Sequence, residues 1–214
     1  QVYAALCRQL DKPLCIVTPG EAEATRFAAD LNTLGIPAAV FPARDYVLRP
    51  IEGTAREYEY RRLAVLGELV GGRLRAVAVP AEALTQFTTP KEDFCANTRT
   101  LHTGDTLLRD DLLAALFGAG YTRRAQVDGP GQFSVRGDIV DIFAPDQKMP
   151  VRMEFWGDEI DTLHTFDLTT QRREDAIDKF YLSPAREVLF GKPADAAEQL
   201  RAFLAKQRGK KKTA

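Results

Sequence analysis

The sequence is poor in the residues from which catalytic and metal-binding sites are usually built. Its only two histidines, His102 and His164, are far apart and in no metal-ligand or nucleophile–base pattern, so we interpret both as structural or surface residues. It contains neither a G-x-S-x-G nor a G-x-x-x-x-G-K-[ST] motif. The three cysteines, Cys7, Cys15 and Cys95, are too scattered for a disulfide framework or zinc spacing. We therefore expect no catalysis, no metal and no cofactor in this chain, and a reducing, cytoplasmic setting.

Long apolar runs and an excess of one charge are also missing. No run approaches the roughly 20 apolar residues that cross a bilayer, so we expect no membrane contact. A net charge of −1 does not predict a DNA clamp, and the one dense basic stretch, 206–212, is interpreted as a solvated terminus. The chain has no initiator methionine, and we expect it to be a piece of a longer protein.

The pattern of the first 96 residues predicts a parallel α/β layer. Short apolar runs alternate with amphipathic segments, which is typical of a parallel sheet covered on both faces. The predicted strands are 14–17, 38–41 and 76–79, and the predicted helices are about 24–34 and 55–70.

The pattern changes after residue 96. A helix at 110–117 precedes strand candidates from 121 to 166, separated by glycine-rich turns at hairpin-like distances. The fold class we predict is α/β, a parallel layer carrying an inserted antiparallel α+β domain. The layer covers 1–96, the insert covers 97–175, and 176–214 return to the layer as a helical segment with a helix over 194–206.

The strand predicted around residues 151–156 offers a surface suited to binding protein. Its alternation sends one set of side chains inward and the other outward. The inward set is Val151, Met153 and Phe155, and the outward set is Arg152, Glu154 and Trp156. Arg, Glu and Trp together have the composition of an interaction hot spot, although physics alone favours an ordinary solvated face. We also expect a β-bulge at Gly137, because both faces become apolar from Ile139 onward.

A series of short motifs runs through this region in a fixed order. They are Gly120-Tyr121-Thr122-Arg123, Phe133-Ser134-Val135-Arg136-Gly137-Asp138-Ile139-Val140-Asp141-Ile142-Phe143, Arg152-Met153-Glu154-Phe155-Trp156-Gly157-Asp158-Glu159-Ile160, Phe166-Asp167 and Thr170-Gln171-Arg172. The stretch resembles the UvrA-binding domain shared by the excision-repair helicase UvrB and the transcription-repair coupling factors. The resemblance implies UvrA as partner.

The flanking sequence separates these two families. UvrB has a tyrosine-rich, DNA-gripping hairpin after the second strand, whereas residues 41–53 here are similar to coupling factors. The resemblance therefore implies a degenerate helicase-like α/β layer without motor function. It implies contacts to UvrA from Arg123, Arg136 and the strand around Glu154 and Phe155, to which we add Arg152 and Trp156. Ser134 departs from UvrB-type sequences, which have a second arginine there, and this predicts weaker charge pairing.

The resemblance also implies a setting for the longer protein. Coupling factors carry an ATP-driven DNA translocase, which uses ATP and Mg, and a domain that binds RNA polymerase. They link stalled transcription to nucleotide excision repair, and the UvrA-binding module is expected to contact the motor domain and restrain it. Two alternatives stay open. One is a fragment of an active UvrB-type ATP-dependent helicase that binds damaged DNA, with a phosphate loop just upstream of Gln1, and the other is an inert structural domain.

Overall fold

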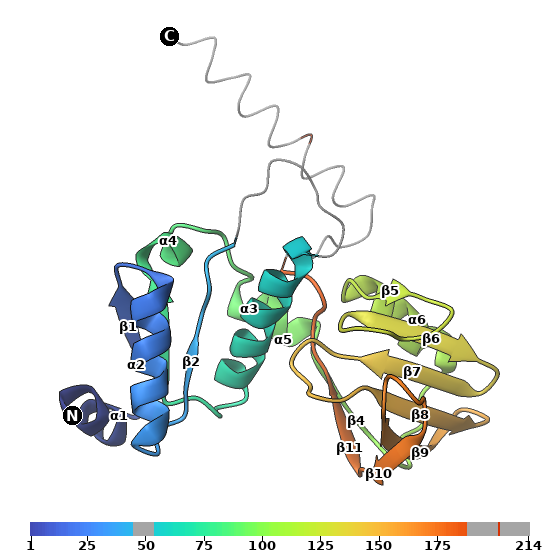
Figure 1. The fold of residues 1–214 in the computed structure, drawn as a ribbon. Coiled ribbons are helices and arrows are strands. Elements are labelled where there is room, and N and C mark those ends of the chain that lie inside the picture. The colour runs from blue at the N-terminus through green and yellow to red at the C-terminus, as the bar shows by residue number, and fades with distance from the viewer. Residues whose placement is uncertain (45–53, 188–200, 202–214) are drawn as a thin grey trace.

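The structure is a computed structural model that describes residues 1–44, 54–187 and 201 (Figure 1). The segment 45–53, which holds most of the sequence predicted to replace the UvrB hairpin, lies outside the described residues. So do the predicted helix at 194–206, apart from Arg201, and the basic stretch 206–212.

The first part of the chain forms a three-stranded parallel sheet, as the alternating pattern predicts. The sheet order is β1-β3-β2, and both neighbouring pairs are parallel. The elements are α1 (Val2–Gln9), β1 (Leu14–Thr18), α2 (Glu21–Thr33), β2 (Ala38–Val40), α3 (Thr54–Val70) and β3 (Ala76–Pro80).

Helices cover both faces of this sheet. Ile16 and Ala76 pack with α1 and α2, whereas Val77 and Val79 pack against Val65 and its neighbours on α3. Because β3 is central and fully buried, its residues are apolar throughout, as expected for a parallel strand.

The rest of the described chain is mainly antiparallel. Its elements are α4 (Ala81–Leu84), α5 (Lys91–Ala96), β4 (Arg99–His102), α6 (Arg109–Gly118), β5 (Thr122–Arg123), β6 (Gln132–Arg136), β7 (Ile139–Phe143), β8 (Val151–Trp156), β9 (Glu159–Phe166), β10 (Arg173–Ala176) and β11 (Lys179–Leu182). A six-stranded sheet has the order β10-β9-β8-β7-β6-β5, with only β5 parallel to its neighbour. The mixed α/β class is thus confirmed, and descent of the parallel layer from a helicase stays a prediction.

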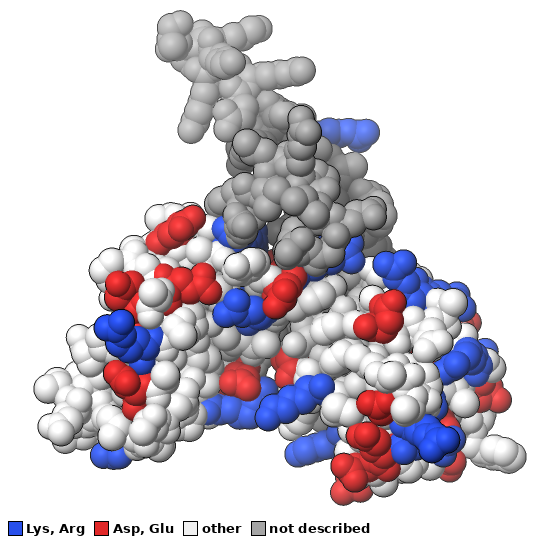
Figure 2. All heavy atoms as spheres, viewed as in Figure 1, with Lys and Arg blue, Asp and Glu red and all other residues white. Residues whose placement is uncertain are grey.

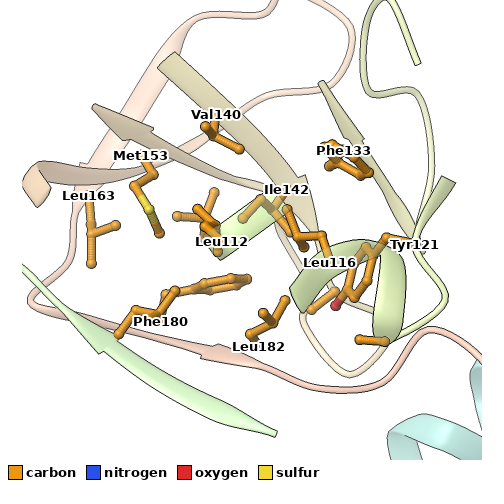
Figure 3. Close-up of a cluster of buried hydrophobic side chains, with 14 of the residues drawn as sticks. Leu112, Leu116, Tyr121, Phe133, Val140, Ile142, Met153, Leu163, Phe180 and Leu182 are labelled. Atoms are coloured by element: carbon orange, nitrogen blue, oxygen red, sulfur yellow. The ribbon is translucent and has the colours of Figure 1, made fainter. Parts of the chain in front are cut away.

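One face of the six-stranded sheet holds the main core. Leu112 and Leu116 project from α6 towards strand residues such as Ile142, and Phe180 and Leu182 close the cluster from β11 (Figure 3). All five side chains are almost completely buried. The helix and the β4–β11 ribbon therefore cover the middle of this face, and they leave the opposite face of the sheet open to a partner.

The chain after residue 175 takes part in both halves of the molecule. Residues 179–182 form β11, which pairs with β4, so the described part of the predicted return, 176–187, is not helical. Glu187 then reaches the parallel layer. Its buried carboxylate accepts from Arg62 Nε at 2.9 Å and from Arg44 Nε at 2.7 Å. The domain boundaries at 96 and 175 stay predictions.

The predicted bulge at Gly137 is wrong. Arg136 pairs with Ile139, so Gly137 and Asp138 form a two-residue hairpin turn, and the φ of +60° at Gly137 is the reason a glycine is needed there. In β8, the register with β9 shifts between Glu154 and Phe155.

No helix in the described ranges is both long and apolar enough to cross a membrane.

Candidate functional site

The candidate site is the solvent-facing side of β6, β7 and β8, here called the polar face. It consists of Arg136, Asp141, Arg152, Glu154 and Trp156. The burial of β8 alternates as the sequence predicts, with the inward set buried in the core, Arg152 and Glu154 partly buried and Trp156 exposed. Secondary structure alone therefore brings four of the predicted site residues to one face.

Asp141 lies at the centre of the polar face. It is fully buried, in the middle of β7, and it pairs with Ser134 on one side and Arg152 on the other. Its Oδ2 accepts from Arg136 Nη2 at 2.7 Å and from Arg152 Nη2 at 3.0 Å, and its Oδ1 accepts from Arg152 Nε at 2.7 Å. One carboxylate thus holds two of the arginines predicted to contact a partner.

Arg152 is committed to the protein itself. Its side chain is only 11% exposed, and Nη1 donates to the carbonyl oxygen of Gln171 at 3.2 Å in addition to the two bonds to Asp141. Its guanidinium also stacks on the Phe166 ring, 4.7 Å from the centroid. The hydrogen bonds to Asp141 are the main cause that raises the pKa of Arg152 above its ordinary value. Each of the three guanidinium nitrogens of Arg152 therefore already makes a hydrogen bond within the chain.

The turn after β9 helps to hold the side chain of Arg152 in place, and its contacts account for the Phe-Asp and Thr-Gln-Arg motifs. Asp167 accepts from the Thr170 backbone nitrogen at 2.7 Å and from its hydroxyl at 2.8 Å, and these bonds lower the pKa of Asp167. The turn places Gln171 at a φ of +60°, with its side chain donating to Leu168 O at 2.8 Å. The Gln171 carbonyl is then aimed at Arg152.

Arg136 is the cation that the polar face presents. Its side chain is 48% exposed, and the bond from Nη2 to Asp141 is the one hydrogen bond it makes within the described residues. Arg173, with nearly the same exposure, also makes one hydrogen bond, to Glu154 of the same face. The exposed donors of Arg136 therefore remain available to an acceptor outside the chain.

Trp156 ends β8 just before the second two-residue turn and is 82% exposed. Exposure of this degree is unusual for the largest apolar side chain, and aromatic residues with such exposure are frequent at protein interfaces.

Two predicted contact residues lie elsewhere. Phe155 is 6% exposed and belongs to the main core, so its ring is not offered on the polar face. Arg123 is exposed on β5, and its register partner is the buried Phe133, which places Arg123 at the sheet edge on the side opposite the polar face.

Sequence reasoning missed Asp141 and Gln171 as parts of the site. The sequence did contain a signal for Asp141, because it is a charged residue inside the apolar strand Ile139–Phe143, and a buried charge needs a partner. No sequence signal pointed to Gln171, because it acts through its backbone carbonyl. Ser134, where an arginine was expected, is buried next to Asp141, and its hydroxyl has no hydrogen-bond partner in the described part of the chain.

Charges of both signs are interspersed over the surface visible in Figure 2. No group of three or more potential metal ligands occurs among the residues that the structure describes.

Comparison with known proteins agrees with this region's motifs. Residues 100–188 match the family model of the UvrB interaction domain, a segment that contains the whole polar face. Relatives named transcription-repair-coupling factor include those of Bacillus subtilis (strain 168), Myxococcus xanthus and Mycobacterium bovis. They are 28%, 35% and 37% identical to this chain over 92%, 88% and 83% of its length.

The matched regions are a small part of these relatives, since the chain spans only 15% to 17% of their length. The similarity nevertheless extends through both the parallel layer and the antiparallel unit. The chain therefore belongs to the transcription-repair-coupling factor family, corresponds to part of its N-terminal region and contains a UvrB interaction domain.

Proposed function

We propose that this chain is a non-catalytic docking module that binds UvrA through the polar face. The observation that carries the proposal is that the segment matching the UvrB interaction domain includes every residue of that face. The exposed Arg136 and Trp156 are the types of side chain that dominate binding energy at protein interfaces.

The charges of the face favour an acidic partner surface. Arg136, Arg152 and Asp141 together carry one net positive charge, and it resides on the exposed Arg136. Glu154 and Arg173 neutralise each other. We assign Arg136 and Trp156 as contacts, with Arg152 and Glu154 holding the face in shape, and Arg123 as a separate contact at the sheet edge.

In the longer protein, this module recruits UvrA to stalled transcription sites for nucleotide excision repair. The translocase, with its ATP and Mg, and the contacts to RNA polymerase and DNA are assigned to other parts of that protein. An intramolecular contact between the module and the motor restrains the motor until UvrA is needed. Deleting residues 97–175 from the intact protein should then raise its ATPase rate, and an unchanged rate would show that there is no restraint.

The alternative, an active UvrB-type helicase fragment, is less well supported because the relatives described above are coupling factors. It predicts a G-x-x-x-x-G-K-[ST] loop in the sequence preceding Gln1, and that sequence discriminates the two.

The direct test is calorimetric titration of this chain with purified UvrA at two salt concentrations. Arg136→Ala should weaken binding by about 2 kcal/mol, roughly thirtyfold, because it removes the exposed cation of the face. Arg61→Ala is the matched control. It removes one equally exposed arginine, which pairs with Glu21 on the parallel layer and away from the polar face, and it should change the affinity less than about threefold.

Two outcomes contradict the proposal. Absence of binding by a folded chain rejects UvrA docking altogether. Equal losses in Arg136→Ala and Arg61→Ala show that general surface charge, and not the arrangement of the polar face, sets the affinity.

A further inference from the structure

We propose that Asp141 is a positioning residue for the docking contact, which fixes the guanidinium of Arg136 in its binding orientation. This inference rests on the proposed function, and it adds a specific role for a buried residue that cannot itself touch a partner. Its motivation is geometric. A fully buried carboxylate in the centre of β7 holds Arg136 at 2.7 Å while nearly half of that arginine's side chain stays exposed.

The support for Arg136 is a chain of contacts that begins in the turn after β9. The Gln171 carbonyl fixes Nη1 of Arg152, and Phe166 stacks under the same guanidinium. Arg152 then binds both oxygens of Asp141, which leaves that carboxylate with a single orientation. Asp141 Oδ2 in turn accepts from Arg136. Arg136 is therefore ordered before a partner arrives.

Ordering in advance strengthens binding, because a free arginine loses side-chain entropy when a partner immobilises it. That loss weakens affinity by about threefold to tenfold for a side chain with many rotamers. An arginine has five N–H donors, so Arg136 can bind Asp141 through Nη2 and still direct other donors outward. A lysine at this position has one ammonium group and cannot extend a planar fork in both directions.

Positioning and simple charge attraction predict opposite results for one substitution. Asp141→Asn removes a negative charge, so the face gains one unit of positive charge. If the face acted only through its net charge, an acidic partner would bind the variant more tightly. If Asp141 positions Arg136, the variant binds more weakly despite the added positive charge.

The experiment measures association and dissociation rates of UvrA with wild type, Asp141→Asn and Asp138→Asn by surface-based kinetics. Asp138 is the matched control, because it lies in the turn next to Arg136 and its side chain is 78% exposed, where it contacts Arg109 instead. Both substitutions change the net charge equally. We expect Asp141→Asn to raise the dissociation rate about threefold to tenfold, and Asp138→Asn to leave it unchanged.

A double substitution separates positioning from general damage to the fold. Asp141→Asn should have no further effect on affinity in a chain that already carries Arg136→Ala, because its target is gone. An equal loss in both backgrounds overturns the proposal, and so does unchanged or tighter binding by Asp141→Asn alone. Absence of binding by the wild type rejects the docking function itself, which is a different result.

A second variant keeps the test decisive if Asp141→Asn fails to fold. Arg136→Lys changes an exposed side chain and keeps its charge. We expect at least a threefold loss of affinity, because an ammonium group bonded to Asp141 presents no planar fork of donors to the partner. Binding by Arg136→Lys within twofold of the wild type overturns the proposal.

Discussion

We expect the buried carboxylate of Glu187 to contribute strongly to the stability of the fold. Glu187 follows β11 in the chain, and its carboxylate binds side chains of α3 and of the loop before α3. Arg62, Arg44 and Thr88 all donate to it, at 2.9, 2.7 and 3.2 Å. The side chains of Glu187 and Arg62 are completely buried. Glu187→Ala removes the acceptor shared by these three donors.

Removing one partner of a buried, hydrogen-bonded ion pair typically costs about 3–5 kcal/mol. Arg62 keeps its bonds to the carbonyls of Pro42 and Phe87 and its stacking on Phe41, so we expect a loss near the lower end, about 3 kcal/mol. For a chain of this size that corresponds to a fall of roughly 6–12 °C in the unfolding midpoint.

Urea denaturation followed by far-ultraviolet circular dichroism measures this loss. Fluorescence is less suitable, because Trp156 is already exposed in the folded state. The control is Glu21→Ala, which breaks the pair between Glu21 and Arg61, the α3 residue next to Arg62. That pair spans 3.6 Å with both side chains more than 40% exposed, and its loss should cost less than about 1 kcal/mol. Similar losses in the two variants would refute the assignment of Glu187 as a buried tie.

Three further predictions concern stability and the exposed tryptophan. Burial raises the pKa of Asp146, so its ionisation opposes folding as the pH rises above the ordinary aspartate range. Asp146→Asn, which keeps an acceptor for Ser183 Oγ, should therefore raise the thermal midpoint at pH 7 and lose this advantage below about pH 4. Gly67→Ala should lower the free energy of unfolding, measured by urea denaturation, by about 1–3 kcal/mol despite the higher helix propensity of alanine, because the new Cβ would lie 2.9 Å from Asp146 Oδ2. Trp156→Ala should leave the thermal midpoint within about 2 °C but weaken UvrA binding by at least tenfold in calorimetry, and an unchanged affinity removes Trp156 from the site.

The parallel layer and the face of β8 were predictable because periodicity encodes them directly. The runs at 14–17 and 76–79 lie within observed strands, and the alternation along 151–156 places Arg152 and Trp156 on the solvent side, as found. Local patterns of this kind record which side chains are buried, and burial is the dominant constraint on a sheet.

Periodicity could not predict which arginine is exposed enough to contact a partner. Arg136 and Arg152 look equivalent in the sequence, but Asp141 and the carbonyl of Gln171 bind Arg152 inside the protein, whereas Arg136 stays half exposed. That distinction depends on contacts between residues up to 19 positions apart. The face of Arg123 was also hidden, because it depends on the parallel pairing of β5 with β6.

If this chain docks on UvrA at the surface that UvrB binds, the two proteins compete for UvrA. A preformed complex of UvrA with labelled UvrB is titrated with this chain, and the anisotropy of the label is followed. We expect the wild type to displace UvrB, and Arg136→Ala to do so only at about thirtyfold higher concentration. Binding of the chain to UvrA without any displacement of UvrB would show that the two proteins use different surfaces of UvrA.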